Sequence, residues 1–157
     1  MLINKNKIVI LYISIIFFLS SCAEKTLLPE EEIKAYISAA KQSAESRSHN
    51  DLADLISEHY QDQKSLNKKK IASLARAYFF RHKNIHLFTK LDSINFQKDK
   101  EAFVVVYVAM AGTAITDVNM LSNLRARIYR FELLLIKNNE WLLQQARWSP
   151  AKLTDIL

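Results

Sequence analysis

Two side chains in this sequence have the types and the spacing to orient a bound ligand. Tyr78 and His82 are four residues apart, so on a helix they lie one turn apart on the same face. Leu74 precedes them on the same apolar stripe, and we therefore expect both side chains to line a pocket inside the protein. The alternative is a core tyrosine and a histidine at the helix C-terminus, where the macrodipole favours the protonated imidazole.

A second candidate site is formed by arginines on a predicted strand. Alternation along the strand places Arg125 and Arg127 on one face and Arg130 on the other. Together with Arg147 on the neighbouring strand, they would form a basic patch that binds a carboxylate or a phosphate. The alternative is a solvated sheet face on which charged side chains pair across strands.

Other catalytic or metal chemistry is not indicated. His82 and His86 are also four apart, but a helix end is predicted between them and no third ligand is nearby, so we expect neither a metal ion nor another cofactor. Asp92 and Asp99 belong to a strand end and a turn, where carboxylates are usually solvated. No nucleophile accompanies a base, so we assign no catalytic residue and favour a non-catalytic domain.

The most specific pattern lies at the N-terminus. Lys5 and Lys7 precede an apolar run of 12 residues, Ile8 to Leu19, which is followed by two serines and Cys22. This is the layout of a secretory signal peptide. The run is too short to span a bilayer, which takes roughly 20 residues. Cys22 is the only cysteine, so the chain forms no internal disulfide.

Residues 19–22, Leu-Ser-Ser-Cys, resemble the lipobox of bacterial lipoproteins, in which an aliphatic residue and two small residues precede an invariant cysteine. The resemblance implies that residues 1–21 are a cleaved signal peptide, that Cys22 carries the lipid, and that residues 22–28 tether the domain to the membrane. In the enterobacterial sorting pattern, an aspartate after the cysteine retains the protein in the inner membrane. Ala23 at that position favours the outer membrane of a Gram-negative bacterium, facing the periplasm.

Charge and length fit one exported domain. Removal of residues 1–21 takes away two lysines and lowers the net charge from +6 to +4. The remaining charges are spread along the chain, so we expect no binding to nucleic acid. The only two prolines, Pro29 and Pro150, bracket the predicted domain at residues 29–150 and leave residues 151–157 as a C-terminal tail.

Helical patterns come first along the mature chain. Pro29 and the three glutamates after it are typical of a helix start, because proline fits the first helical position and acids face the positive end of the macrodipole. Ser48 or Asn50 can cap a second, shorter helix. Asn67 can cap a third, which carries Tyr78.

Strand patterns follow, as the apolar period changes from 3.6 to 2. The predicted strands cover residues 85–96, 102–111, 123–136 and 141–148, with a loop at 112–122. Helices followed by antiparallel strands predict an α+β fold in which the helices pack on one face of the sheet.

Three segments of this order resemble the NTF2-like superfamily, which includes the SnoaL-like proteins. Residues 51–60 are similar to the family's helix and tyrosine loop, residues 77–85 to the helix that runs into the first long strand, and residues 138–148 to the closing turn and apolar strand with two tryptophans. The resemblance spans about residues 30–150. It implies a cone, with N-terminal helices in the concavity of a curved antiparallel sheet of about four strands, and it brings no active-site signature.

Two predicted strands, at residues 103–110 and 131–136, are apolar on both faces. Helices cover only one face of such a sheet, so the other face needs a cover of its own. NTF2-like proteins commonly pair through that face, and we expect a homodimer or a protein partner there. The alternative is that the C-terminal residues 149–157 cover it.

These patterns favour a lipid-anchored protein of the cell envelope whose domain binds a small apolar ligand or a protein partner without catalysis. Two alternatives stay open. One is an accessory structural subunit of an envelope complex. The other is a small isomerase-like or dehydratase-like enzyme that uses Tyr78 and His82 in the cone.

Overall fold

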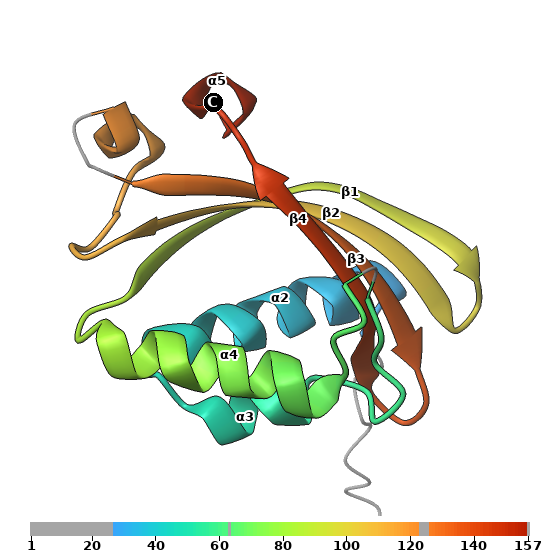
Figure 1. Cartoon of the computed structure of the whole chain (residues 1–157). Helices are drawn as coiled ribbons and strands as arrows, with labels where there is room; N and C mark the ends of the chain where they lie inside the picture. The colour runs from blue at the N-terminus through green and yellow to red at the C-terminus, as the bar shows by residue number, and fades with distance from the viewer. Residues whose placement is uncertain (1–26, 63, 123–125, 157) are drawn as a thin grey trace, which may run out of the picture.

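The computed structural model describes residues 27–62, 64–122 and 126–156. Within these ranges, three helices precede four strands (Figure 1). The elements are α2 (Pro29–Glu45), α3 (His49–Asp54), α4 (Lys68–Arg81), β1 (His86–Lys98), β2 (Glu101–Ala111), the short 3₁₀ helix η1 (Val118–Ser122), β3 (Arg127–Lys137), β4 (Trp141–Pro150) and α5 (Leu153–Ile156). Within the described ranges, no helix combines the length and the apolar character needed to cross a membrane.

The helices begin at residues that the sequence predicts. Pro29 stands at the start of α2, with three glutamates in the first turn. The Ser48 side chain accepts a hydrogen bond from a backbone N–H in the first turn of α3 (3.4 Å), and the Asn67 side chain does the same for α4 (3.0 Å). Asn50, the other predicted cap, lies inside α3.

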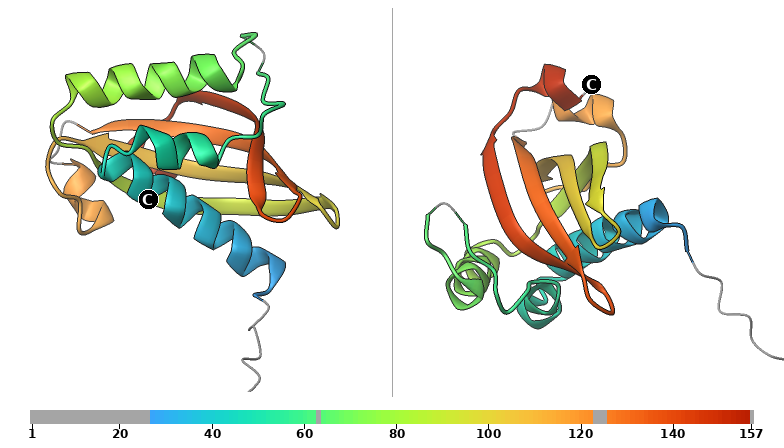
Figure 2. Two further views of the ribbon diagram at one scale, coloured as in Figure 1. Left: turned by 90° about the horizontal axis from the view of Figure 1, so that it is seen from below. Right: turned by 90° about the vertical axis from the view of Figure 1, so that its right-hand side faces the viewer.

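The four strands form one antiparallel sheet in the order β1-β2-β3-β4. The sheet curves around α2, α3 and α4, which all lie on its concave side, as Figure 2 shows from two further directions. The predicted α+β architecture is therefore confirmed. β3 begins at Arg127, which pairs with Met110 near the end of β2, and residues 123–125 of the predicted strand lie outside the described residues.

A bulge in β4 decides which face of the sheet its two tryptophans occupy. The pairing of β3 with β4 shifts between Leu134 and Leu135, which leaves Gln144 as an extra residue in β4. Strict alternation would send Trp141 and Trp148 to opposite faces. With the extra residue, both lie on the concave side, where Trp141 is part of the main core and Trp148 packs against it.

The concave side has two ends that are packed differently. At the closed end, next to the β1–β2 and β3–β4 hairpins, the first half of α2 lies directly on the sheet. Its Ile33 has no exposed surface, and Glu32 accepts hydrogen bonds from the Lys137 amine and the Trp141 indole. At the open end, α4 packs mainly against α3, and its apolar stripe faces the sheet across a cavity.

The convex face of the sheet is covered behind the open end. There η1 and α5 bury Leu121 and Ile156 in a small cluster around Ala109 of β2. Figure 1 shows both short helices on the side of the sheet opposite to α2 and α4. Part of the C-terminal tail thus covers this region, while the convex face near the hairpins has no helix on it in the described part of the chain.

Candidate functional site

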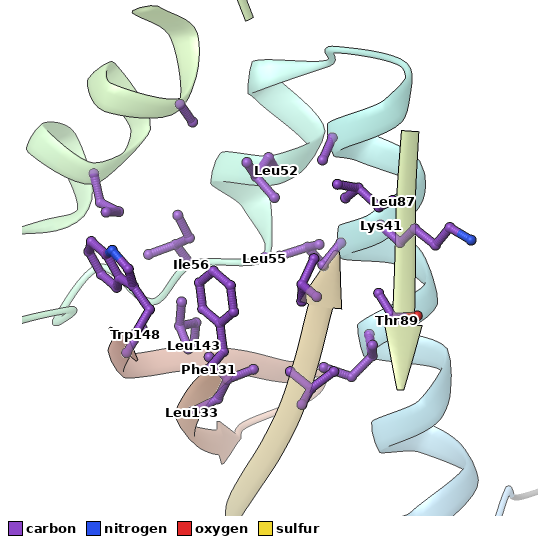
Figure 3. Close-up of a pocket in the computed structure, with 18 of the residues that line it drawn as sticks. Lys41, Leu52, Leu55, Ile56, Leu87, Thr89, Phe131, Leu133, Leu143 and Trp148 are labelled. Carbon is purple, nitrogen blue, oxygen red and sulfur yellow. The ribbon is translucent and has the colours of Figure 1, made fainter. Parts of the chain in front are cut away.

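A cavity of about 420 Å³ lies between the helices and the concave face of the sheet at the open end (Figure 3). Helices α2, α3 and α4 and all four strands contribute to its wall, and the lining side chains are almost all aliphatic or aromatic. Those that Figure 3 labels are Lys41, Leu52, Leu55, Ile56, Leu87, Thr89, Phe131, Leu133, Leu143 and Trp148.

The cavity exists because α4 stands away from the sheet and small side chains face the gap. Ala40 and Ala44 on α2 and Ala75 on α4 present only methyl groups to it. Protein interiors are otherwise packed with few voids larger than a water molecule. An apolar cavity offers water no hydrogen-bond partners, so it accepts an apolar molecule more readily than water.

Two buried tyrosines supply polar atoms in the cavity wall. The Tyr36 hydroxyl donates a hydrogen bond to the Leu55 carbonyl (3.2 Å), and burial raises the pKa of Tyr36 well above its ordinary value. The Tyr60 hydroxyl donates to the Asp62 carboxylate (3.5 Å), and burial, with a smaller contribution from the charge of Asp62, raises the pKa of Tyr60 to about 12. Both hydroxyls therefore stay protonated at neutral pH and remain hydrogen-bond donors.

Sequence reasoning did not select these tyrosines. Tyr36 shares the helical spacing of the apolar residues Ile33, Ile37 and Ala40, and that spacing was the available signal. Tyr60 follows α3 in a segment without helical or strand periodicity, so no pattern indicated its burial. Lys41 was also missed; it is the one charged residue in the described lining, and its amine extends away from the cavity (Figure 3).

Of the predicted pair Tyr78 and His82, only one side chain lines the cavity. Tyr78 lines the cavity, whereas His82 is exposed and does not line it, so the expectation that both point into the interior is wrong for His82. Helix α4 ends at Arg81, and His82 has an extended backbone conformation, so the four-residue helical spacing no longer sets its direction. The imidazole instead stacks on the Tyr78 ring, with centroids 4.0 Å apart.

The predicted arginines are divided between the two faces of the sheet. Arg127 lies on the concave side, next to the cavity, while Arg125 is outside the described residues. Arg130 and Arg147 lie on the convex side, where both pair with Glu132. Arg147 therefore does not join Arg127 in one basic patch, and the convex arginines form the charge pairs that the alternative interpretation predicts.

Arg127 lines a second hollow, of about 200 Å³, that adjoins the cavity. The two spaces share part of their wall, at the ends of the strands and the C-terminal half of α4. The shared residues are Tyr78, Met110, Phe131 and Trp148.

In the described part of the chain, no three His, Cys, Asp or Glu side chains lie close enough together to hold a metal ion. Cys22, the predicted point of lipid attachment, and the predicted signal peptide at residues 1–21 lie outside the described ranges.

No protein-family model matches this sequence, and no curated protein matches it either. Solved structures do match. A putative scytalone dehydratase from Novosphingobium aromaticivorans has a TM-score of 0.65 at 11% identity, with 78% of this chain and 84% of that chain covered. An NTF2-like protein of unknown function from Shewanella oneidensis has a TM-score of 0.58 at 14% identity, with 78% and 99% covered.

A third similar structure is a putative calcium/calmodulin-dependent protein kinase type II association domain from Thiobacillus denitrificans. It has a TM-score of 0.60 at 15% identity, with 76% of this chain and 94% of that chain covered. The names of these proteins include an enzyme and an association domain, so one fold serves several functions. At these identities the similarity establishes the fold alone: this chain has an NTF2-like α+β fold, with helices packed in the concavity of a curved four-stranded antiparallel sheet.

Proposed function

We propose that this chain is a lipid-anchored protein of the bacterial cell envelope whose domain binds a small apolar ligand without changing it chemically. The cavity at the open end supports the binding role most directly, because it measures about 420 Å³ and its wall is almost wholly apolar. Small-molecule sites in proteins typically measure about 300–1,000 Å³, with an apolar lining and a few polar groups that orient the ligand. The volume and the apolar lining of this cavity fit that description, while the Tyr36 and Tyr60 hydroxyls in its wall already donate their protons to Leu55 and Asp62.

Binding fits the described lining better than acid–base catalysis does. General acid–base catalysis at neutral pH works best with a group whose pKa lies near the working pH. The titratable side chains in the described lining are one lysine and three tyrosines, and burial holds the pKa of Tyr60 at about 12. The enzymatic alternative uses Tyr78 and His82, and of these two only Tyr78 lines the cavity.

The binding proposal is tested with dodecanol and the mature chain, residues 22–157, in which Cys22→Ser prevents lipidation. We expect calorimetry to detect dodecanol binding. Ala75→Phe places a large ring in the cavity and should weaken binding at least about tenfold, because the ring occupies the space of the alkyl chain. Ala77→Phe makes the same change on the exposed side of α4 and should have no effect.

Circular dichroism establishes that both phenylalanine variants are folded. If the unsubstituted mature chain does not bind dodecanol, the proposal fails. It also fails if Ala75→Phe and Ala77→Phe bind dodecanol equally well, because the alkyl chain is then bound elsewhere.

The anchoring part of the proposal is supported by the resemblance of residues 19–22 to a lipobox. Intact-mass spectrometry of the protein from bacterial membranes should find a chain that begins at Cys22 and carries a diacylglyceryl group. Cys22→Ser should abolish this modification. A chain that still begins at Met1, without added lipid, contradicts the anchor.

A second candidate role is self-association through the convex face near the hairpins. Phe103 of β2 pairs with Leu134 of β3, and Leu142 of β4 continues this apolar surface, which no described helix covers. An accessory role in an envelope complex would use the same surface. Sedimentation velocity of the mature chain should find a dimer at micromolar concentration and a monomer after Leu134→Lys. A monomeric unsubstituted chain contradicts the dimer.

A further inference from the structure

We propose that the ligand of the cavity is an anionic amphiphile, whose apolar body fills the cavity and whose head group is bound by Arg127 in the adjoining hollow. This inference rests on the proposed ligand-binding function and adds the charge of the ligand to it. The two head groups with suitable chemistry are carboxylate and phosphate, since both match the planar fork of a guanidinium group.

The first support is the arrangement of the two spaces. The cavity of about 420 Å³ and the hollow of about 200 Å³ share the side chains of Tyr78, Met110, Phe131 and Trp148. Only Arg127 and Tyr129 belong to the hollow alone. A molecule that extends from one space to the other thus passes from an apolar wall to a guanidinium group and a phenol.

The second support is the set of hydrogen-bond donors around the hollow. Within the described residues, the Arg127 guanidinium, the Tyr129 hydroxyl and the Trp148 indole N–H have no hydrogen-bond partner. The Tyr78 hydroxyl contacts only the sulfur of Met110, at 3.9 Å. A carboxylate or phosphate accepts hydrogen bonds from all of these groups and donates none when fully ionised.

The third support is the charge at the open end. The Lys64 amine lies 4.9 Å from the centroid of the Trp148 ring and adds a second cation near Arg127. Asp62, two residues before Lys64, is buried and already accepts hydrogen bonds from the backbone N–H groups of Lys64 (2.8 Å) and Leu66 (2.9 Å). An arriving anion is therefore attracted by this end of the cavity.

Lys41 is the competing cation, since it also lines the cavity. Its amine extends away from the other labelled lining side chains (Figure 3), whereas Arg127 lies in a hollow of its own next to the cavity. The geometry therefore favours Arg127 as the group that binds the head group.

The test compares dodecanoate with dodecanol, which share the alkyl chain and differ in charge. With the mature chain carrying Cys22→Ser, we expect dodecanoate to bind about tenfold more tightly than dodecanol, because a charged hydrogen bond contributes at least that factor. Arg127→Gln should lower the affinity for dodecanoate to about that for dodecanol, whereas Arg147→Gln should keep the preference. Arg147→Gln is the matched control, because Arg147 adjoins Trp148 in β4 but points to the convex face.

The possible outcomes separate the inference from the proposed function. Equal affinity for the two probes in the unsubstituted chain overturns the inference and leaves apolar ligand binding intact, whereas binding of neither probe overturns both. A preference for dodecanoate that survives Arg127→Gln and disappears in Lys41→Gln also overturns the inference. Dodecyl phosphate distinguishes the head groups: tighter binding than dodecanoate assigns a phosphate, and weaker binding assigns a carboxylate.

Discussion

The closed end and the open end of this domain share one sheet and one layer of helices, but they differ in how closely the helices pack on the sheet. At the closed end, α2 lies on the sheet, and Ile33, Ala102 and Leu135 have no exposed surface. At the open end, α4 stands off the sheet and Leu74, which lines the cavity, keeps 51% of its surface exposed. The difference indicates that one end supplies the stability that allows the other end to keep a cavity.

The largest effect should follow from a truncation in the closed end. Ile33→Ala removes a fully buried side chain and leaves a void, so we expect the free energy of unfolding to fall by about 2–5 kcal/mol. Leu74→Ala is the matched change at the open end and should cost less than about 1 kcal/mol, because half of that side chain is already in water. Urea unfolding of the two variants measures both values. Equal losses would contradict the division into two ends.

The next effect concerns a polar contact where the two ends meet. Tyr36→Phe removes the hydrogen bond to the Leu55 carbonyl and should cost about 1 kcal/mol in the free energy of unfolding. Because burial raises the pKa of Tyr36, its neutral form stabilises the fold below the ordinary tyrosine pKa of about 10, and this contribution is lost as pH rises further.

Unfolding experiments at several alkaline pH values check this prediction. Above about pH 10 the free energy of unfolding of the unsubstituted chain should fall, and that of the Tyr36→Phe variant should fall less steeply. Tyr129→Phe is a suitable control, since Tyr129 is only half-buried and lines the open hollow. An identical alkaline loss in the Tyr36 variant would show that this hydroxyl is not the group responsible.

A smaller effect is expected from the charge cluster at the closed end. The Lys137 amine and the Trp141 indole donate hydrogen bonds to Glu32, and both lower the pKa of its carboxyl group, Lys137 by more than Trp141. Since the folded-state pKa is lowered, Glu32 stabilises the protein above its ordinary pKa, and the contribution disappears as pH falls through the lowered value. Glu32→Gln should therefore lower the Tm at pH 7 and change the Tm little at pH 3. Scanning calorimetry at the two pH values measures both effects.

Glu30→Gln serves as the comparison for that experiment, because Glu30 is an exposed acid in the same helical turn. A Tm difference for Glu32→Gln that persists unchanged at pH 3 would mean that the charge of Glu32 does not stabilise the closed end.

The smallest effect should come from the rim of the open end. Lys64→Met removes the cation above the Trp148 ring, a contact of an exposed side chain that is worth about 0.5–1 kcal/mol at most. We expect a change near the detection limit of urea unfolding, together with a shift in Trp148 fluorescence. A loss as large as that of Ile33→Ala would contradict the view that the open end carries little of the stability.

Much of the fold followed from local patterns. Pro29, Ser48 and Asn67 mark helix starts because the first backbone N–H groups of a helix lack partners within it, and this chemistry is the same in any protein. The period-2 apolar runs likewise predicted β1, β2 and β4 to within a few residues. The lipobox-like residues 19–22 stay a prediction, since they lie outside the described part of the chain.

The site was harder to predict because its residues are placed by long-range packing. His82 falls outside the cavity because α4 ends one residue earlier, and a boundary error of one residue is enough to redirect a side chain. Trp148 reaches the cavity because Gln144 is an extra residue in β4, and a bulge depends on pairing with β3. Tyr60 is buried by contacts across the sheet edge that no local period indicates.

By itself, the sequence determined the order of helices and strands, the caps, and the α+β class, since each depends on neighbours a few residues apart. Only the tertiary structure decided that α4 stands off the sheet, that Tyr36, Tyr60 and Trp148 meet around one cavity, and that Arg127 adjoins it while Arg130 and Arg147 face away. The physical reason is that a cavity depends on the distance between whole elements that pack against each other. The local residue pattern of a single helix or strand does not determine this distance.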